Sequence, residues 1–262
     1  MATENPTGSG CLATLFMIIV ALLVSTHALT TPLISDVPPT PSEAVMLQFS
    51  ANATADQQQA TVDIISQRLT ALGITPDVQL QPGQGDSAPT IRVLLPGGDN
   101  FQAALDLISQ PGDFELVDLS GLNPTDYQDV LIWTTHQAEM GAVHAADARQ
   151  HPETNQPFTT VLDNTHLMKA EVVVDGELGT WTINAIFDQE GGGILGIFTA
   201  AHIGEPLAIV VDGRVLSAPV IEAPITGEAA ITGNFTLTEA RQLAAKIGFG
   251  ALPVPLELIS LS

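Results

Sequence analysis

The fold of the second half of this chain is decided by the stretch Leu207-Ala-Ile-Val-Val-Asp-Gly-Arg-Val-Leu-Ser-Ala-Pro-Val-Ile221. Its first five residues are all apolar, which predicts a continuous buried strand. Asp212-Gly213 is a dipeptide that two-residue hairpin turns favour, because such turns require a positive φ. The stretch therefore predicts a hairpin whose first strand lies in the core.

The residues on either side of this hairpin predict a second layer of strands and helices. Apolar residues alternate from Trp181 to Phe187, as they do in a half-buried strand, and helical spacing follows between residues 194 and 201. Further on, Thr236 and Glu239 form a capping box, and an apolar helical stripe then runs to Gly248.

The first half of the chain predicts a different α+β unit. Helical spacing between residues 62 and 72 ends at Gly73, a typical C-terminal cap, and Pro111-Gly112 turns the chain into a last short strand. The order strand–helix–strand–strand–helix–strand is the split unit of a ferredoxin-like sandwich. Strands are predicted at 45–49, 78–80, 91–95 and 114–116, with helices at 62–72 and 101–108.

Residues 119–157 are mainly polar, and we interpret them as an insertion or linker between the two units. This segment contains His136, His144 and His151, which could in principle bind a metal. Their spacings match no standard ligand pattern, so we expect solvated loop histidines and no metal site.

Charge limits the partners of this protein. The chain has 29 acidic and seven basic residues and a formal net charge of −22. Such a surface repels phosphate backbones and anionic lipid, so nucleic acid is not an expected partner, whereas a cationic partner would be attracted. Cys11 is the only cysteine, which excludes an internal disulfide.

An apolar segment near the N-terminus predicts export. Residues 11–24 are apolar except for Thr14, and a looser apolar continuation makes a membrane span possible. We favour a retained single-pass anchor over residues 1–35, a Pro-rich linker over 36–42, and a folded part outside the cytoplasm. The alternative is a signal peptide, cleaved near Ala28, and a secreted protein.

Several ordered segments resemble the large periplasmic domain of the SecD/SecDF protein-export family: Leu207–Ile221, Pro224–Gly227, Ile231–Thr236 and Gly250–Leu256. Upstream, Ile64–Gly73 and Val93–Gly97 are similar to the membrane-proximal base of that domain. Together with the N-terminal segment, the resemblance predicts an α+β protein with one transmembrane helix, a ferredoxin-like base over 43–118 and a second α+β head over 158–258.

The resemblance implies a base and a mobile head that contact a polypeptide emerging from the Sec channel and keep it from sliding back. In that family, proton flow through later membrane helices drives export, and this sequence has no second apolar run of spanning length. We expect an extracytoplasmic accessory module that binds unfolded export substrate or Sec translocon subunits without its own motor. The alternative is a repurposed envelope scaffold with no role in export.

The residues that carry the resemblance are candidates for a binding surface, although each also has a structural interpretation. Asp212-Gly213 suits a turn, and Pro219 suits the end of a strand. Gly227 and Gly233 suit loops. The full set is Asp212, Gly213, Ser217, Ala218, Pro219, Ile225, Thr226, Gly227, Thr232, Gly233, Phe235, Gly250, Ala251, Leu252 and Pro253.

A rival pattern, Gly191-x-Gly193-x-x-Gly196, matches the dinucleotide fingerprint between a predicted strand and a helix. It would place a pyrophosphate at the helix N-terminus and Asp212 on a ribose hydroxyl. Asp188 would repel that phosphate, and the hairpin turn already requires Asp212. We therefore expect no enzyme and no catalytic or cofactor-binding residues.

The same glycines are unfavourable inside a helix, by about 1 kcal/mol each relative to Ala. From this cost we expect a loosened first turn across Gly191–Gly196, with weak protection from hydrogen exchange.

Overall fold

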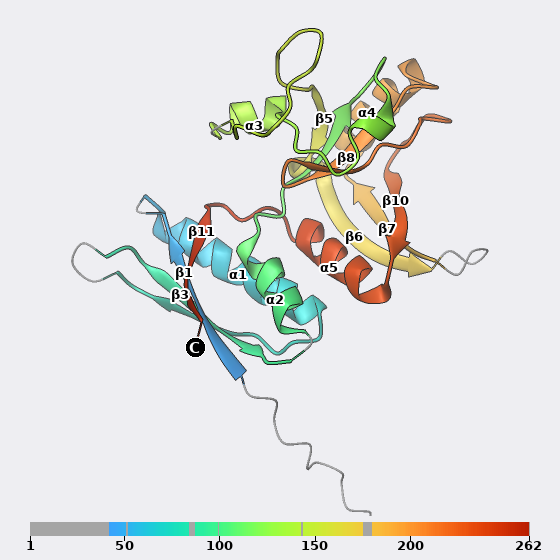
Figure 1. Ribbon diagram of the computed structural model, residues 1–262. Helices are drawn as coiled ribbons and strands as arrows, with labels where there is room; N and C mark the ends of the chain where they lie inside the picture. The colour runs from blue at the N-terminus through green and yellow to red at the C-terminus, as the bar shows by residue number, and fades with distance from the viewer. Residues whose placement is uncertain are drawn as a thin grey trace, which may run out of the picture. The chain divides into compact units, whose positions relative to one another are not determined.

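A computed structural model describes residues 42–50, 52–83, 87–98, 100–142, 144–174 and 180–261 (Figure 1). The predicted anchor over residues 1–35 lies outside these residues, as does the predicted linker except for Ser42. Within the described ranges, no helix is both long enough and apolar enough to cross a membrane. The described chain is α+β, as the sequence predicts, and contains a base and a head.

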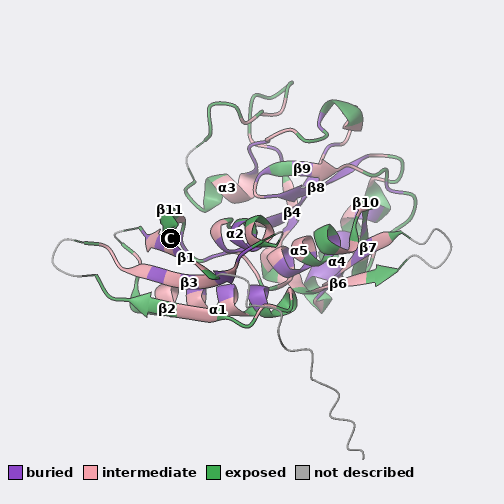
Figure 2. Cartoon of the chain, turned by 60° about the horizontal axis from the view of Figure 1, so that its bottom comes forward, coloured by how far each residue is buried: buried purple, intermediate pink, exposed green. Residues whose placement is uncertain are grey.

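The base is an antiparallel sheet of order β11-β1-β3-β2, packed against two helices (Figure 1). Alternate residues such as Leu47 and Val93 face Ile65 and Ile108 of the helices, and all four side chains are buried (Figure 2). The elements are β1 (Ser42–Phe49), α1 (Ala55–Ala71), β2 (Asp77–Gln81), β3 (Thr90–Pro96), α2 (Phe101–Ser109) and β11 (Leu256–Leu261). The predicted helices and first three strands are confirmed.

The fourth strand of the base is not the one that the sequence order suggested. The predicted strand after Pro111-Gly112 is β4 (Phe114–Asp118), and it pairs with strands of the head. Its place beside β1 is taken by β11, from the other end of the described chain. The reason is burial: β4 is buried on both faces, and a base with helices on one face only cannot cover it. Placing this strand in the base was wrong.

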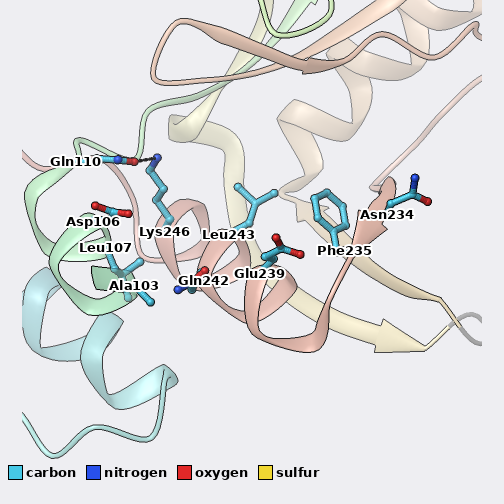
Figure 3. A pocket seen from close by; sticks show the side chains of 10 residues that line it. All are labelled: Ala103, Asp106, Leu107, Gln110, Asn234, Phe235, Glu239, Gln242, Leu243 and Lys246. Atoms are coloured by element: carbon cyan, nitrogen blue, oxygen red, sulfur yellow. Dashed lines mark hydrogen bonds between the residues drawn. The ribbon is translucent and has the colours of Figure 1, made fainter. Parts of the chain in front are cut away.

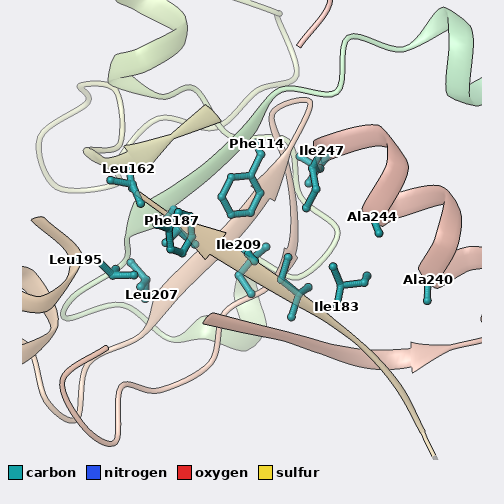
Figure 4. Close-up of a cluster of buried hydrophobic side chains, with 14 of the residues drawn as sticks. Phe114, Leu162, Ile183, Phe187, Leu195, Leu207, Ile209, Ala240, Ala244 and Ile247 are labelled. Carbon is teal, nitrogen blue, oxygen red and sulfur yellow. The ribbon is translucent and has the colours of Figure 1, made fainter. Parts of the chain in front are cut away.

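The head has two sheets, with orders β5-β4-β8-β9 and β10-β7-β6. Inward-facing side chains of both sheets meet helices α4 and α5 in one core (Figure 4). The remaining elements are α3 (Thr135–Glu139), β5 (Thr160–Asp163), β6 (Leu167–Val174), β7 (Trp181–Phe187), α4 (Gln189–Ala201), β8 (Leu207–Val211), β9 (Arg214–Ser217), β10 (Glu228–Phe235), α5 (Leu237–Gly248) and the short 3-10 helices η1 (Pro124–Asp126) and η2 (Asn164–His166).

Strand β8 explains why residues 207–211 are apolar without interruption. Ile209 faces the core between the sheets, whereas Val210 faces a second cluster on the opposite side. That second cluster includes Tyr127 and Ile132 of the segment 119–157, expected to be a polar insertion, and Phe158 directly after it. The segment therefore covers the outer face of the β4–β8 pair, and its description as a loose polar linker is wrong.

The predicted hairpin is confirmed. Asp212 has φ 51° and Gly213 has φ 76°, so both turn residues are left-handed and β8 pairs with β9. Four strands were not predicted: β5, β6, β10 and β11. Gly233, expected in a loop, lies within β10.

Helix α4 is regular through its glycines, which differs from the expected loosened first turn. Asp188 caps it by accepting a hydrogen bond from the Gly191 amide at 2.7 Å. The glycines allow close packing: a Cβ on Gly192 would lie 2.9 Å from the Gly227 nitrogen, and one on Gly196 would lie 2.7 Å from Thr226 Cγ2. Close approach to the loop at residues 225–227 accounts for Gly192 and Gly196.

The topology excludes the dinucleotide fold. A Rossmann crossover joins adjacent parallel strands of one sheet. Here β7 precedes α4 and pairs antiparallel with β6 and β10, while β8 follows in the other sheet. The carboxylate of Asp188 also occupies the helix N-terminus, where a phosphate would bind.

Base and head are joined at a junction around Arg68, whose side chain is fully buried. The chain passes from base to head after α2 and returns before β11. The guanidinium donates hydrogen bonds of 2.6–2.9 Å to four carbonyl oxygens. One is that of Leu107 in the last turn of α2, and the others, of Gln110, Pro111 and Gly250, lie on these two passages. Burial lowers the pKa of Arg68 to about 10, opposed by the charge of Asp212, so the group stays cationic at neutral pH.

Replacing Arg68 with Met should lower the free energy of unfolding by about 3–5 kcal/mol, because four buried carbonyls lose a charged donor. Urea denaturation measures this change. Arg241→Met removes an exposed arginine from α5 and should change stability by less than about 0.5 kcal/mol. Equal stability of the two variants would contradict the role of the junction.

Two glycines of helix α4 provide a second matched pair of variants. Gly192→Ala should destabilise the protein, because its Cβ meets a backbone nitrogen that cannot move aside. Gly193→Ala meets nothing within 4 Å and should stabilise it by about 0.5–1 kcal/mol through helix propensity. Thermal melting of both variants tests this, and stabilisation by Gly192→Ala would refute the packing argument.

Candidate functional site

A groove of about 470 Å³ between α2 of the base and α5 of the head is a candidate binding site (Figure 3). The end of β10 contributes to the same groove, which we call the α2–α5 groove. It is lined by Ala103, Asp106, Leu107, Gln110, Asn234, Phe235, Glu239, Gln242, Leu243 and Lys246.

The amphipathic pattern of each helix places these side chains. Leu107 is buried on α2, and Leu243 is half-buried on α5, immediately before the buried pair Ala244 and Ala245. Phe235, the last residue of β10, is also half-buried and comes just before the N-cap of α5. The groove therefore has apolar surface, with amide and carboxylate side chains around it.

One end of the groove is fixed by Lys246, whose ammonium contacts the Gln110 side chain and the Asp212 carboxylate. The other oxygen of Asp212 accepts hydrogen bonds from the Gly112 amide at 2.7 Å and the Asp113 amide at 2.9 Å. A turn residue of the head hairpin thus binds both α5 and the passage from base to head.

The structure distributes the residues of the family resemblance over several places. Phe235 alone among them lines the groove, and Asp212 reaches it through Lys246. Gly250 and Leu252 lie at the junction, where the Leu252 amide donates to the Pro111 carbonyl at 2.8 Å. The hairpin and its exit contain Gly213, Ser217, Ala218 and Pro219. The loop against α4 contains Ile225, Thr226 and Gly227, and strand β10 contains Thr232 and Gly233. Leu252 is flanked by Ala251 and Pro253.

Sequence reasoning missed most of the groove. Leu243 was recognised as part of a helical stripe, but Asp106, Leu107, Gln110 and Lys246 were not selected. Their spacing shows which face of each helix they share. Nothing in that spacing shows that α2 and α5 face each other.

The three histidines of residues 119–157 do not come together. His144 packs edge-on against Trp133, and His151 lies against Phe158. His136 differs from the expected solvated histidine: its ring nitrogens lie 3.3 Å from Asp113 and 3.1 Å from Asp163. Among the described residues, no group of three potential ligands is arranged to hold a metal ion.

The His136 contacts hold α3 on the β4–β5 edge. The hydrogen bond with Asp113 is the main cause that raises the pKa of His136 to about 9, and burial opposes it. Nearby, burial raises the pKa of Glu115, while hydrogen bonds from Thr160 and Thr134 counteract that rise. We call His136, Asp113, Asp163 and Glu115 the His136 cluster.

Comparison with known proteins gives consistent matches. Residues 142–254 match the family model of the SecDF P1 head subdomain. Protein translocase subunit SecD of Dictyoglomus turgidum (strain DSM 6724 / Z-1310) is 30% identical over 207 residues, which covers 79% of this chain and 41% of that SecD. SecD of Endomicrobium trichonymphae is 33% identical over 226 residues, covering 78% of this chain and 46% of that protein.

Solved structures of SecDF also match this chain. A chain from the structure of SecDF, a membrane component that enhances protein export, matches with a TM-score of 0.59 and 28% identity, over 83% of this chain and 98% of that chain. SecDF in its super-membrane-facing form matches with a TM-score of 0.63 and 28% identity, over 85% of this chain and 30% of that chain.

These matches define the folded part as an α+β module similar to the periplasmic domains of SecD and SecDF proteins. It belongs to the SecD/SecDF family. The chain spans less than half the length of the SecD relatives named above.

The His136 cluster should make stability fall at alkaline pH. Because the folded pKa of about 9 lies above the unfolded value of about 6.5, the contribution is complete below about pH 6.5 and lost as the pH rises through about 9. We expect a loss of up to about 3 kcal/mol in unfolding free energy, measured by urea denaturation across this range.

His136→Gln should flatten this pH dependence. His144→Gln, which changes an exposed histidine of the same segment, should keep the wild-type profile. If His136→Gln loses as much stability between pH 6.5 and 9 as the wild type, the assignment is wrong.

Proposed function

We propose that the folded part binds unfolded polypeptide during Sec-dependent export, and that the α2–α5 groove is the binding site. The observation that carries the proposal is this groove, which combines apolar surface with several amide side chains. Gln110, Gln242 and Asn234 can each donate and accept hydrogen bonds, as the main chain of any extended polypeptide requires. Apolar side chains of the polypeptide would contact Leu243 and Phe235, which are half-buried.

An open sheet edge leads into the same groove. β10 is an edge strand of the sheet β10-β7-β6, and its last residues, Asn234 and Phe235, line the groove. Its pairing with β7 is interrupted between Ile231 and Phe235. An extended chain can add to such an edge through main-chain hydrogen bonds, which tolerate many sequences.

The relatives support a role in export. SecD is a protein translocase subunit, and SecDF is described as enhancing protein export. The proposal gives residues 42–261 a binding role in that process and no catalytic step. Docking on translocon subunits and a purely structural envelope role are the competing functions.

Site-specific photocrosslinking tests the proposal in cells that export a stalled substrate. A photoreactive residue in place of Leu243 should form an adduct with the exported polypeptide, because Leu243 faces the groove. The same residue in place of Asp63, exposed on α1, should form none.

The adduct should also require active export. Adducts with translocon subunits alone would favour docking and refute substrate binding in the groove. Adducts of equal yield from both positions, or with export blocked, would equally refute it.

A further inference from the structure

Among the described residues, the lining of the α2–α5 groove carries two carboxylates and no free cation. Asp106 stands on the α2 side and Glu239 on the α5 side, and both residues are exposed. The one cationic side chain in the groove, Lys246, is held by Asp212 and Gln110. A bound polypeptide therefore meets apolar surface between two negative charges.

Both carboxylates can accept further hydrogen bonds from a bound partner. Asp106 accepts a hydrogen bond from the Gln102 amide at 2.8 Å, and Glu239 accepts from the backbone and side chain of Thr236 at 2.8 and 2.9 Å. Hydrogen bonds from the Thr236 backbone and then its side chain hold the pKa of Glu239 below its usual range. Since an ionised carboxylate offers about four acceptor positions, each can still bind an ammonium or guanidinium group.

The net charge of the whole protein also favours the binding of cationic segments. A net charge of −22 attracts cationic segments and repels acidic ones before contact. Among the basic side chains, Arg68 is buried, and Arg214 is paired with Asp129 at 3.3 Å. Arg241 is exposed on α5 next to Gln242 but lies outside the groove lining, where Asp106 and Glu239 are the exposed charges.

We infer that the α2–α5 groove selects polypeptide segments that combine apolar side chains with Lys or Arg, through Asp106 and Glu239. This inference rests on the proposed function, since it names the class of polypeptide that the groove accepts. Apolar residues of the segment lie against Leu243 and Phe235, and flanking cations pair with the two carboxylates. Acidic segments are excluded.

The test uses the full chain and three fluorescent peptides of 12 or so residues, measured by anisotropy. The peptides share their apolar positions and carry Lys, Gln or Glu at all other positions. We expect the Lys peptide to bind about tenfold more tightly than the Gln peptide, and the Glu peptide to bind most weakly. The preference should shrink at high salt, because exposed charges are screened.

Asp106→Asn with Glu239→Gln should remove most of the preference for Lys while leaving the Gln peptide unaffected. Gln at position 239 can still complete the capping box of α5. Asp63→Asn is the matched control: Asp63 is also exposed and accepts from a glutamine four residues earlier, Gln59, at 2.9 Å, but it lies on α1 outside the groove.

The outcomes separate the two proposals. If all three peptides bind with equal affinity and Leu243→Ser weakens the binding of each, the inference is wrong but the proposed function stands. A preference for Lys that survives in the Asp106→Asn, Glu239→Gln variant also overturns it, because general charge would then explain the selectivity. If no peptide binds, the proposed function and the inference both fail.

Discussion

The buried guanidinium of Arg68 is the interaction on which the arrangement of base and head depends. The chain leaves the base once and returns once, and Arg68 binds carbonyl groups on both passages. Gly112 is required beside it, because a Cβ at that position would overlap the guanidinium and lie 2.6 Å from the Lys246 carbonyl. A buried cation surrounded by fixed carbonyls tolerates little displacement, since any unmade hydrogen bond costs the full desolvation of the group.

This junction explains how two separate hydrophobic cores produce one binding surface. α2 belongs to the base and α5 to the head, and each has its own core to cover. Because the passages start at the end of α2 and at the end of α5, fixing them brings these helices together. Lys246, Gln110 and Asp212 complete the contact at the end of the groove. Residues from both parts thereby line one groove.

The head shows how burial overrides sequence order. The β4–β8 pair is apolar on both faces, so it needs a layer on each side. One layer is the second sheet with its helices. The other is the segment 119–158, held by Tyr127 and Phe158 in the core and by the His136 cluster at the edge. Its scattered apolar residues look like a linker in sequence because they follow no regular period.

The sequence by itself determined the local elements: the Asp212-Gly213 hairpin, the Thr236–Glu239 capping box, helix α1 ending before Gly73, and the buried strand β8. These depend on neighbours within a few residues, through turn geometry, capping and periodicity. Only the tertiary structure decided that β4 joins the head, that β11 completes the base, that Gly192 and Gly196 of α4 allow close packing, and that Asp106 and Glu239 line one groove. Strand partners and helix contacts are chosen by burial among residues far apart in the chain, and no local pattern records that choice.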